Sequence, residues 1–333
     1  MSGVLVLLVV VVMALFVVGR TRQLLRRRIV LPGRLLPPPG SVPAAEAFAL
    51  LAALRRRGGL SVLALVAVAA AMLAVQAGWP SGAGLPLVLA PSLALLVLVA
   101  IQALFPLPDE LAPAASTTTR ADITTRRART FGPAWGYALP SLLLAATLAT
   151  LVVAGLRASP DVFGRSREFG YIIQTAPLPG QMGPASGAVS PFPGWYYGIP
   201  VIVLLAVSAL LFGCALHRNA QRPRLRASGL VAFDDAVRTC VGFALSAGAS
   251  ALIGLQLAML ALMAGQALVV AARSASEGVD LGLLSSGLAL LGLSLLLLGG
   301  VAALGATFLS WILGNRRSSA GHAGYLPSDG SPR

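Results

Sequence analysis

The chain has 333 residues, of which 57% are hydrophobic and only 11% are charged. A soluble domain has about a quarter of its residues charged, so this composition excludes a soluble globular fold and makes the lipid bilayer the solvent. All 25 basic residues are arginines and the net charge is +14. The absence of lysine excludes a P-loop of the GxxxxGK[ST] kind and a retinal Schiff base.

Long apolar stretches without charge alternate with arginine-bearing segments along the chain. Each stretch is near or above the ~20 residues that cross a hydrocarbon core of ~30 Å, where only a helix satisfies the backbone within one segment. The sequence therefore predicts an all-α polytopic bundle of transmembrane helices with seven spans. The spans cover residues 3–19, 60–77, 85–105, 134–156, 195–216, 239–272 and 281–313.

The placement of arginine predicts the orientation of these spans, because basic residues near span ends are retained in the cytoplasm. Most arginines fall in the loops after spans 1, 3 and 5 and in the C-terminal segment. Only Arg157, Arg165, Arg167 and Arg273 fall on the opposite side. We therefore expect a multi-pass protein of the cytoplasmic membrane, with its N-terminus outside and its C-terminus inside.

The first span and the cytoplasmic loop 20–59 each leave an alternative. A cleaved signal peptide would need a basic n-region and a small-residue cleavage site, and the first span has neither. Residues 43–57 predict a helix that either lies on the membrane surface, with a turn at Gly58-Gly59, or extends span 2 into the cytoplasm.

Two arginine clusters in this loop are expected to face anionic lipid, which contributes ~1 kcal/mol for each basic residue near the surface. They comprise Arg26, Arg27, Arg28, Arg55, Arg56 and Arg57. No aromatic residues interleave them in a stacking pattern, so nucleic acid is not the expected partner.

Two segments outside the spans have turn-rich sequences. The outer loop 157–194 is rich in proline and glycine and either caps the bundle, binds a molecule outside, or packs irregularly on the helix ends, which is the favoured interpretation. Residues 315–333 contain few apolar side chains and predict a disordered cytoplasmic tail.

Polar side chains are rare at membrane depth, and the predicted spans contain no Asp, Glu or Arg. Intramembrane carboxylates mark ion-coupled carriers, so proton-driven transport by this chain alone is disfavoured. Gln102, Gln256 and Gln266 are the strongest polar groups there. They could bind a neutral or amphiphilic ligand, but interhelical hydrogen bonding at ~1 kcal/mol each is the favoured interpretation.

The sixth span carries small residues at a spacing of four, which predicts one helix face that lets another backbone approach closely. This stripe consists of Gly242, Ser246, Ser250, Gly254 and Ala258.

No catalytic, metal or cofactor site is predicted. The two histidines, His217 and His322, are too few for a paired haem site or a HExxH zinc site, and Cys214 and Cys240 form no CxxC. No nucleophile, base and orienting acid lie together at a plausible depth, so we expect that the chain is not an enzyme.

Arginine without lysine, with a bias to Ala, Leu, Val and Gly, is typical of coding from a GC-rich genome. In this respect the chain resembles multispanning membrane proteins of high-GC actinobacteria. The resemblance is compositional and carries no motif, so it implies a location and no activity.

Two functions remain open. The first is a permease-like or scaffold component of a transport or export system that takes its energy from a partner, such as a separate ATPase or another membrane subunit. The second is a non-catalytic assembly or regulatory subunit that docks proteins or anionic lipid through its cytoplasmic arginine loops.

Overall fold

The computed structural model describes residues 42–105, 134–173, 185–222, 225, 230–274 and 280–320. Six helices in this part are long and apolar enough to cross a membrane. They are α2 (Val42–Gly78), α3 (Leu85–Leu104), α5 (Ala134–Arg157), α6 (Trp195–Gln221), α7 (Val231–Ser274) and α8 (Leu281–Ala320). The architecture is that of a multi-pass membrane protein. The predicted first span and the cluster Arg26–Arg28 lie outside the described residues.

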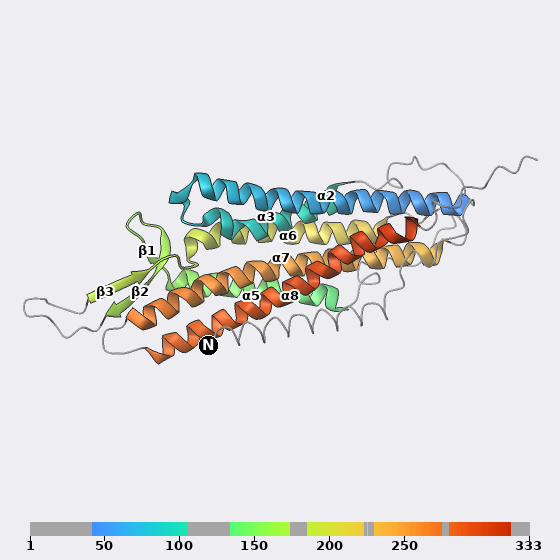
Figure 1. Cartoon of the computed structure of the whole chain (residues 1–333). Helices are drawn as coiled ribbons and strands as arrows, with labels where there is room; N and C mark the ends of the chain where they lie inside the picture. Colours follow the sequence, from blue (N-terminus) through green and yellow to red (C-terminus); the bar gives the residue numbers. More distant parts are fainter. Residues whose placement is uncertain are drawn as a thin grey trace, which may run out of the picture.

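The helices form three antiparallel hairpins, so that α2, α5 and α7 run one way and α3, α6 and α8 return (Figure 1). A 3-10 turn, η2 (Pro80–Gly82), joins α2 to α3. We call the end that carries Arg57, Arg218, Arg222 and Arg238 the arginine end, and the opposite end, which carries a small sheet, the sheet end.

The centre of the bundle is α7, which packs on α3, α5, α6 and α8. In its most apolar window 61% of the residues are buried, against 11% in α2 and 17% in α8. This burial follows from its composition, because Ala, Gly and Ser on α7 let several neighbours approach closely. The outer helices α2 and α8 instead expose apolar side chains over most of their length, as lipid-facing helices do.

Four helix boundaries differ from the predicted spans by more than two residues, one of them the end of α6, which lies at Gln221 instead of residue 216. The α2 helix continues through Gly58 and Gly59, so the extended helix is correct and the surface helix with a turn is wrong. The α7 helix begins at Val231, eight residues before the predicted span 239–272, and α8 continues to Ala320 into the predicted tail.

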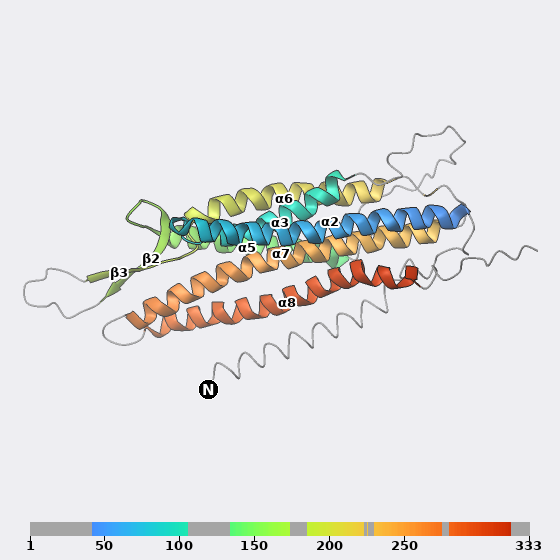
Figure 2. The same cartoon turned by 45° about the horizontal axis from the view of Figure 1, so that its top comes forward.

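An apolar cluster explains why α2 and α7 extend beyond the spans at the arginine end. There Leu50 and Leu54 of α2 are buried against Phe233 and Val237 of α7, each at most 4% exposed. Figure 2 shows α2 lying along α7 in this region. Because each extension covers the apolar face of the other, helical structure persists through Gly58-Gly59 despite the intrinsic cost of glycine.

The segment between α5 and α6 is not irregular throughout. It contains β1 (Ser159–Pro160), β2 (Ser166–Ile173) and β3 (Ala185–Val189), which form an antiparallel sheet in the order β1-β2-β3. Phe169 of β2 pairs with Val189 of β3. Alternating aromatic and aliphatic residues in this segment are the sequence pattern that indicates strands. The high content of proline and glycine in the segment obscures that pattern.

A buried carboxylate holds the turn between β1 and β2 in place. Asp161 accepts hydrogen bonds from the backbone N–H groups of Phe163 and Arg165, and from the side chains of Arg165 and Arg167. Burial by itself would raise the pKa of Asp161, but these hydrogen bonds outweigh it and hold that pKa well below its usual range. The turn before β2 is therefore locked by an ionised aspartate.

Aromatic residues at the start of α6 link this turn and the α2–α3 turn to the bundle. Tyr197 donates a hydrogen bond of 2.6 Å to the Ala83 carbonyl in the α2–α3 turn, and Tyr196 lies against the Arg165 guanidinium. The sheet end thus ties two helical hairpins together.

Candidate functional site at the arginine end

The polar groups of the described bundle gather where α3 and α6 end while α2 and α7 continue. The α6 helix stops at Gln221 because Pro223 follows, and the residue before a proline is biased away from helical backbone. Its last carbonyl groups therefore need partners from outside the helix.

Arg238 of α7 supplies those partners. Its guanidinium donates to the carbonyl oxygens of Asn219, Ala220 and Arg222 at 3.1, 2.9 and 2.7 Å. In return, the Asn219 side-chain amide donates to the Arg238 carbonyl at 3.0 Å. A cation at a helix C-terminus also interacts favourably with the helix dipole, so Arg238 caps α6 both by hydrogen bonding and by charge.

Asp234, one turn earlier on α7, neutralises part of this charge. Its Oδ2 accepts from Arg238 Nε at 2.9 Å and Nη2 at 2.8 Å, and its Oδ1 accepts from Arg222. The three side chains are at most 1% exposed. Buried ion pairs of this kind hold only while every partner is present, because removing one leaves an uncompensated buried charge.

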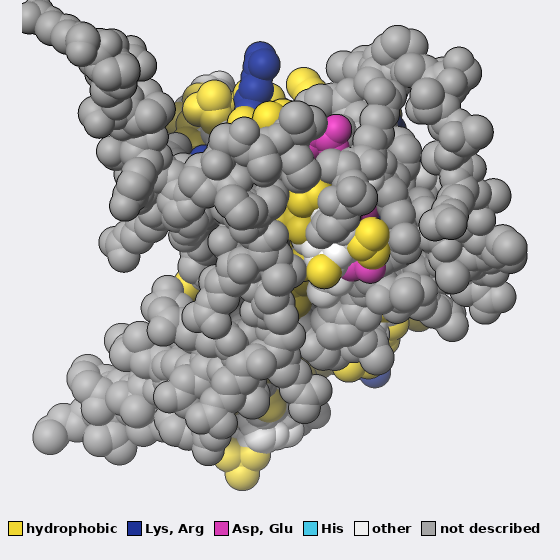
Figure 3. Space-filling model, turned by 90° about the vertical axis from the view of Figure 1, so that its right-hand side faces the viewer, with side chains coloured by type: hydrophobic (Ala, Val, Ile, Leu, Met, Phe, Trp, Pro, Cys, Tyr) yellow, Lys and Arg dark blue, Asp and Glu magenta, His cyan; other side chains and the backbone are white. Residues whose placement is uncertain are grey.

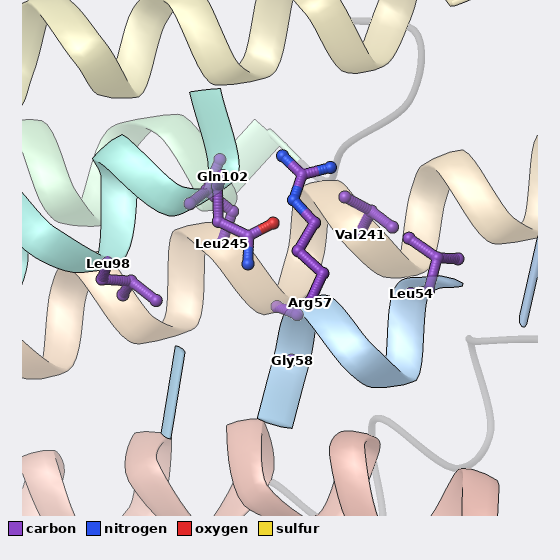
Figure 4. Close-up of a pocket in the computed structure, with 8 residues that line it drawn as sticks. Leu54, Arg57, Gly58, Leu98, Gln102, Val241 and Leu245 are labelled. Atoms are coloured by element: carbon purple, nitrogen blue, oxygen red, sulfur yellow. The ribbon is translucent and has the colours of Figure 1, made fainter. Parts of the chain in front are cut away.

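Two small adjacent hollows lie between this network and α2. Both are lined by Arg57, Gln102, Val241 and Leu245. Each has a volume of about 10 Å³, close to the room that one water molecule needs. Figure 4 shows the Gln102 side chain from α3 pointing towards Arg57 from α2.

The second hollow is the more strongly charged of the two. It is also lined by Arg218, Asn219 and Arg222, and its lining includes no carboxylate among the residues that the structure describes. Arg218 donates to the Ala103 carbonyl at the end of α3, which fixes its position. Arg57 of α2, Arg218 of α6 and Arg222, the residue after α6, therefore line one hollow together.

Gln102 is held in place by a short hydrogen-bond chain. Its Nε2 donates to Ser61 Oγ at 3.1 Å, and Ser61 in turn donates to the Arg57 carbonyl at 3.0 Å. This chain connects α3 to α2 beside the hollows and orients the amide.

The structure does not bring the three predicted glutamines together. Gln256 is fully buried on α7, where its Oε1 accepts from Ser92 Oγ of α3 at 2.8 Å, while Gln266 is exposed near the sheet end. Only Gln102 lines the hollows. A common ligand site made of all three glutamines is therefore not formed.

The Ser92–Gln256 contact leads to a prediction about stability. Gln256 Nε2 is buried without a hydrogen-bond partner, so Ser92→Ala would leave both ends of the amide unpaired. We expect Ser92→Ala to lower the free energy of unfolding in detergent by about 1 to 2 kcal/mol. The double variant S92A/Q256L should recover most of that loss, because it also removes the buried amide. A double variant less stable than S92A would contradict this.

All five residues of the small-residue stripe are buried. At Gly254, an added Cβ would lie 3.2 Å from Val301 of α8 and 3.9 Å from Leu143 of α5. This part of the stripe faces two neighbouring helices rather than lipid.

The arginine cluster at 55–57 is divided between environments. Arg56 is exposed, whereas Arg55 and Arg57 are half-buried, with Arg57 turned towards the hollows. In Figure 3, which looks onto the arginine end, the described side chains that are visible are mainly hydrophobic, with acidic ones among them and basic ones towards the edges.

The predicted spans 195–216 and 239–272 place Arg222, Asp234 and Arg238 in the loop between them. The part that these residues play at the end of α6 was therefore not predicted. The signal was the spacing of Asp234 and Arg238, which is the i, i+4 separation of a helical ion pair. Arg218 and Asn219 had no comparable signal, because their partners lie on other helices.

Among the described residues, no group of three or more His, Cys, Asp or Glu side chains is placed to hold a metal ion. The chemistry that the arginine end offers is hydrogen-bond donation from fixed cations to an anion. Comparison of the chain with protein-family models, curated proteins and solved structures finds no match.

Proposed function

We propose that this protein is a non-catalytic scaffold subunit of a transport or export assembly in the cytoplasmic membrane, with its arginine end in the cytoplasm and its energy supplied by a partner. The observation that carries the proposal is where the packed part and the arginine cluster of the bundle lie. The interior of the described bundle is filled by α7, while Arg57, Arg218 and Arg222 gather at one end.

A scaffold is favoured over a pathway by the packing of α7. Its small residues lie against several helices, and Gln256, a buried polar group at depth, bonds to Ser92 rather than facing a wide cavity. Charged solutes need compensating groups to cross a bilayer, and the described ionisable residues lie towards the two ends.

A second function, a regulatory subunit, is supported by the paired extension of α2 and α7. This extension continues past the ends of α3 and α6, which suits it to contact with a soluble protein. Both functions place the partner at the arginine end, and they differ in whether that partner hydrolyses nucleotide.

Mild detergent extraction, affinity purification and an ATPase assay test the proposal. We expect the purified chain alone to show no ATP hydrolysis, and the complex to contain a nucleotide-hydrolysing subunit.

Arg56→Glu should reduce recovery of that subunit several-fold, since Arg56 is exposed at the arginine end. The matched control is Arg157→Glu, an exposed arginine at the sheet end, which should leave recovery unchanged. A complex with only non-hydrolysing proteins would favour the regulatory subunit, and solute uptake by the chain alone in liposomes would contradict both.

The orientation is tested separately by cysteine labelling in a Cys214→Ser background, because Cys214 is exposed and Cys240 is buried. Ser186→Cys on β3 should react with an impermeant thiol reagent in intact cells, and Ala52→Cys on α2 should react only after permeabilisation. Both positions are exposed, so access by the reagent depends on the side of the membrane. The reverse pattern would contradict the proposed orientation.

A further inference from the structure

The turn between β1 and β2 exposes two adjacent apolar side chains at the sheet end. Val162 is 93% exposed and Phe163 is 75% exposed. Because the hydrogen bonds of Asp161 fix the backbone of this turn, both side chains are held at the surface. Exposed apolar patches of this kind mark surfaces that meet another protein or a membrane.

The turn belongs to a row of aromatic residues along the sheet end. The Arg165 guanidinium carbon lies 4.7 Å from the centre of the Phe163 ring and 5.4 Å from that of the Tyr196 ring. Tyr196 donates a hydrogen bond of 3.3 Å to the Gly82 carbonyl, and a Cβ at Gly82 would lie 2.7 Å from the Trp79 ring. Trp and Tyr side chains gather where a membrane protein meets the lipid headgroups, so this row is typical of that level.

The backbone of the turn is satisfied by hydrogen bonds within the turn itself. Asp161 Oδ1 accepts from the N–H groups of Phe163 and Arg165, each at 2.8 Å. The Gly164 N–H donates to the Asp161 carbonyl, and the Asp161 N–H donates to the Arg165 carbonyl, each at 2.9 Å. The Asp161 carboxylate is 1% exposed and is paired with Arg165 and Arg167. Since non-helical backbone meets an apolar medium only where its polar groups have partners, this turn is suited to contact with lipid.

We propose that this turn is a membrane anchor, in which Val162 and Phe163 enter the boundary between headgroups and acyl chains at the sheet end. Amphipathic helices that lie in this boundary bury their apolar face to a depth of about 5 to 10 Å. Here a rigid turn takes the place of such a helix, with the ion pairs of Asp161 at its base. This role goes beyond the scaffold function and does not depend on it.

A continuous apolar surface favours lipid over a soluble protein as the occupant. The turn lies beside the end of α2 in Figures 1 and 2, and Arg165 Nη1 donates to the Ser81 carbonyl of the α2–α3 turn at 3.4 Å. Leu73 near the end of α2 and Trp79 directly after it are also exposed. Because the lipid-facing surface of α2 continues into the turn, the bilayer that covers α2 also reaches Val162 and Phe163.

The strand β2 provides a matched control position. Ile172 is also apolar and is 65% exposed. It lies near the far end of β2, and Figures 1 and 2 show β2 and β3 extending past the helix ends. We therefore expect Ile172 to face water while the turn meets the bilayer.

Electron paramagnetic resonance of the full chain in phosphatidylcholine bilayer discs tests the proposal. A nitroxide spin label is attached to Val162→Cys or to Ile172→Cys in the Cys214→Ser background, in which the remaining Cys240 is buried. Both positions are exposed, so the label displaces no packed side chain. At Val162 we expect collisions with oxygen, which partitions into lipid, to exceed collisions with a water-soluble nickel chelate several-fold. At Ile172 we expect the reverse.

Three results would overturn the proposal. Chelate collisions above oxygen collisions at Val162 would place the turn in water and leave it free for a soluble protein. Equal values at the two positions would mean that the turn has no closer contact with lipid than the rest of the sheet. Spin–spin broadening at Val162 that disappears on dilution with unlabelled chain would assign the patch to a second copy. Failure to find an ATPase partner leaves each of these outcomes unchanged.

Discussion

Asp234→Asn is expected to lower the free energy of unfolding in detergent by about 3 to 5 kcal/mol, the largest effect among the described side chains that we consider. The substitution keeps the size of the side chain but removes the negative charge between Arg222 and Arg238, all three of which are buried. Both guanidinium groups then lose the charge of the carboxylate that they share. Arg238 also caps α6, so the loss reaches the end of a second helix.

Asp235→Asn is the matched control, because Asp235 is the next residue on α7 and is only half-buried. Thermal unfolding followed by circular dichroism should place this variant within about 0.5 kcal/mol of the parent. Equal destabilisation of the two variants would mean that negative charge near the start of α7 stabilises the arginine end, and that the buried ion pairs of Asp234 do not.

Gly287→Ala should cost about 1 to 3 kcal/mol through overpacking of the α7–α8 hairpin. A Cβ at Gly287 would lie 2.8 Å from Val269 Cγ2 and 2.9 Å from the Gly265 carbonyl oxygen. The second contact is with backbone, which cannot rotate away, so the two helices must separate.

Gly292→Ala on the same helix provides the comparison, since nothing lies within 4 Å of the Cβ that it adds. Its unfolding midpoint should match or exceed that of the parent, because alanine is the better helix former. If Gly287→Ala and Gly292→Ala have the same unfolding midpoint, then α7 and α8 do not approach each other as closely as they do in the structure.

The membrane-spanning character of six helices could be predicted from the sequence because it depends on runs of apolar residues, a local property. The limits of α7 could not, because Asp234 and Arg238 look like loop charges until the end of α6 is placed beside them. The continuity of α2 depends in the same way on Phe233 and Val237, which are distant in sequence.

The candidate site was predictable only in fragments. Gln102 and Arg57 were each conspicuous, one as a polar residue in an apolar stretch and the other as part of a triple arginine. Both residues lie close to Arg218 only because of the way in which α2, α3 and α6 pack. The spacing of residues along the chain carries no information about this packing. Gln266 shows the converse, since a polar residue in a span proved to be exposed and distant from the hollows.

The central position of α7 also determines when the protein can become compact during its synthesis. A ribosome makes α2, α3, α5 and α6 before α7, yet α3, α5 and α6 all pack on α7. The α2–α3 and α5–α6 hairpins can associate through α3 and α6 as soon as α6 has been made, but α3 and α5 gain their packing against α7 only when α7 follows. The bundle is therefore completed late, and a chain interrupted before α7 would leave α5 without the helix on which it packs most extensively.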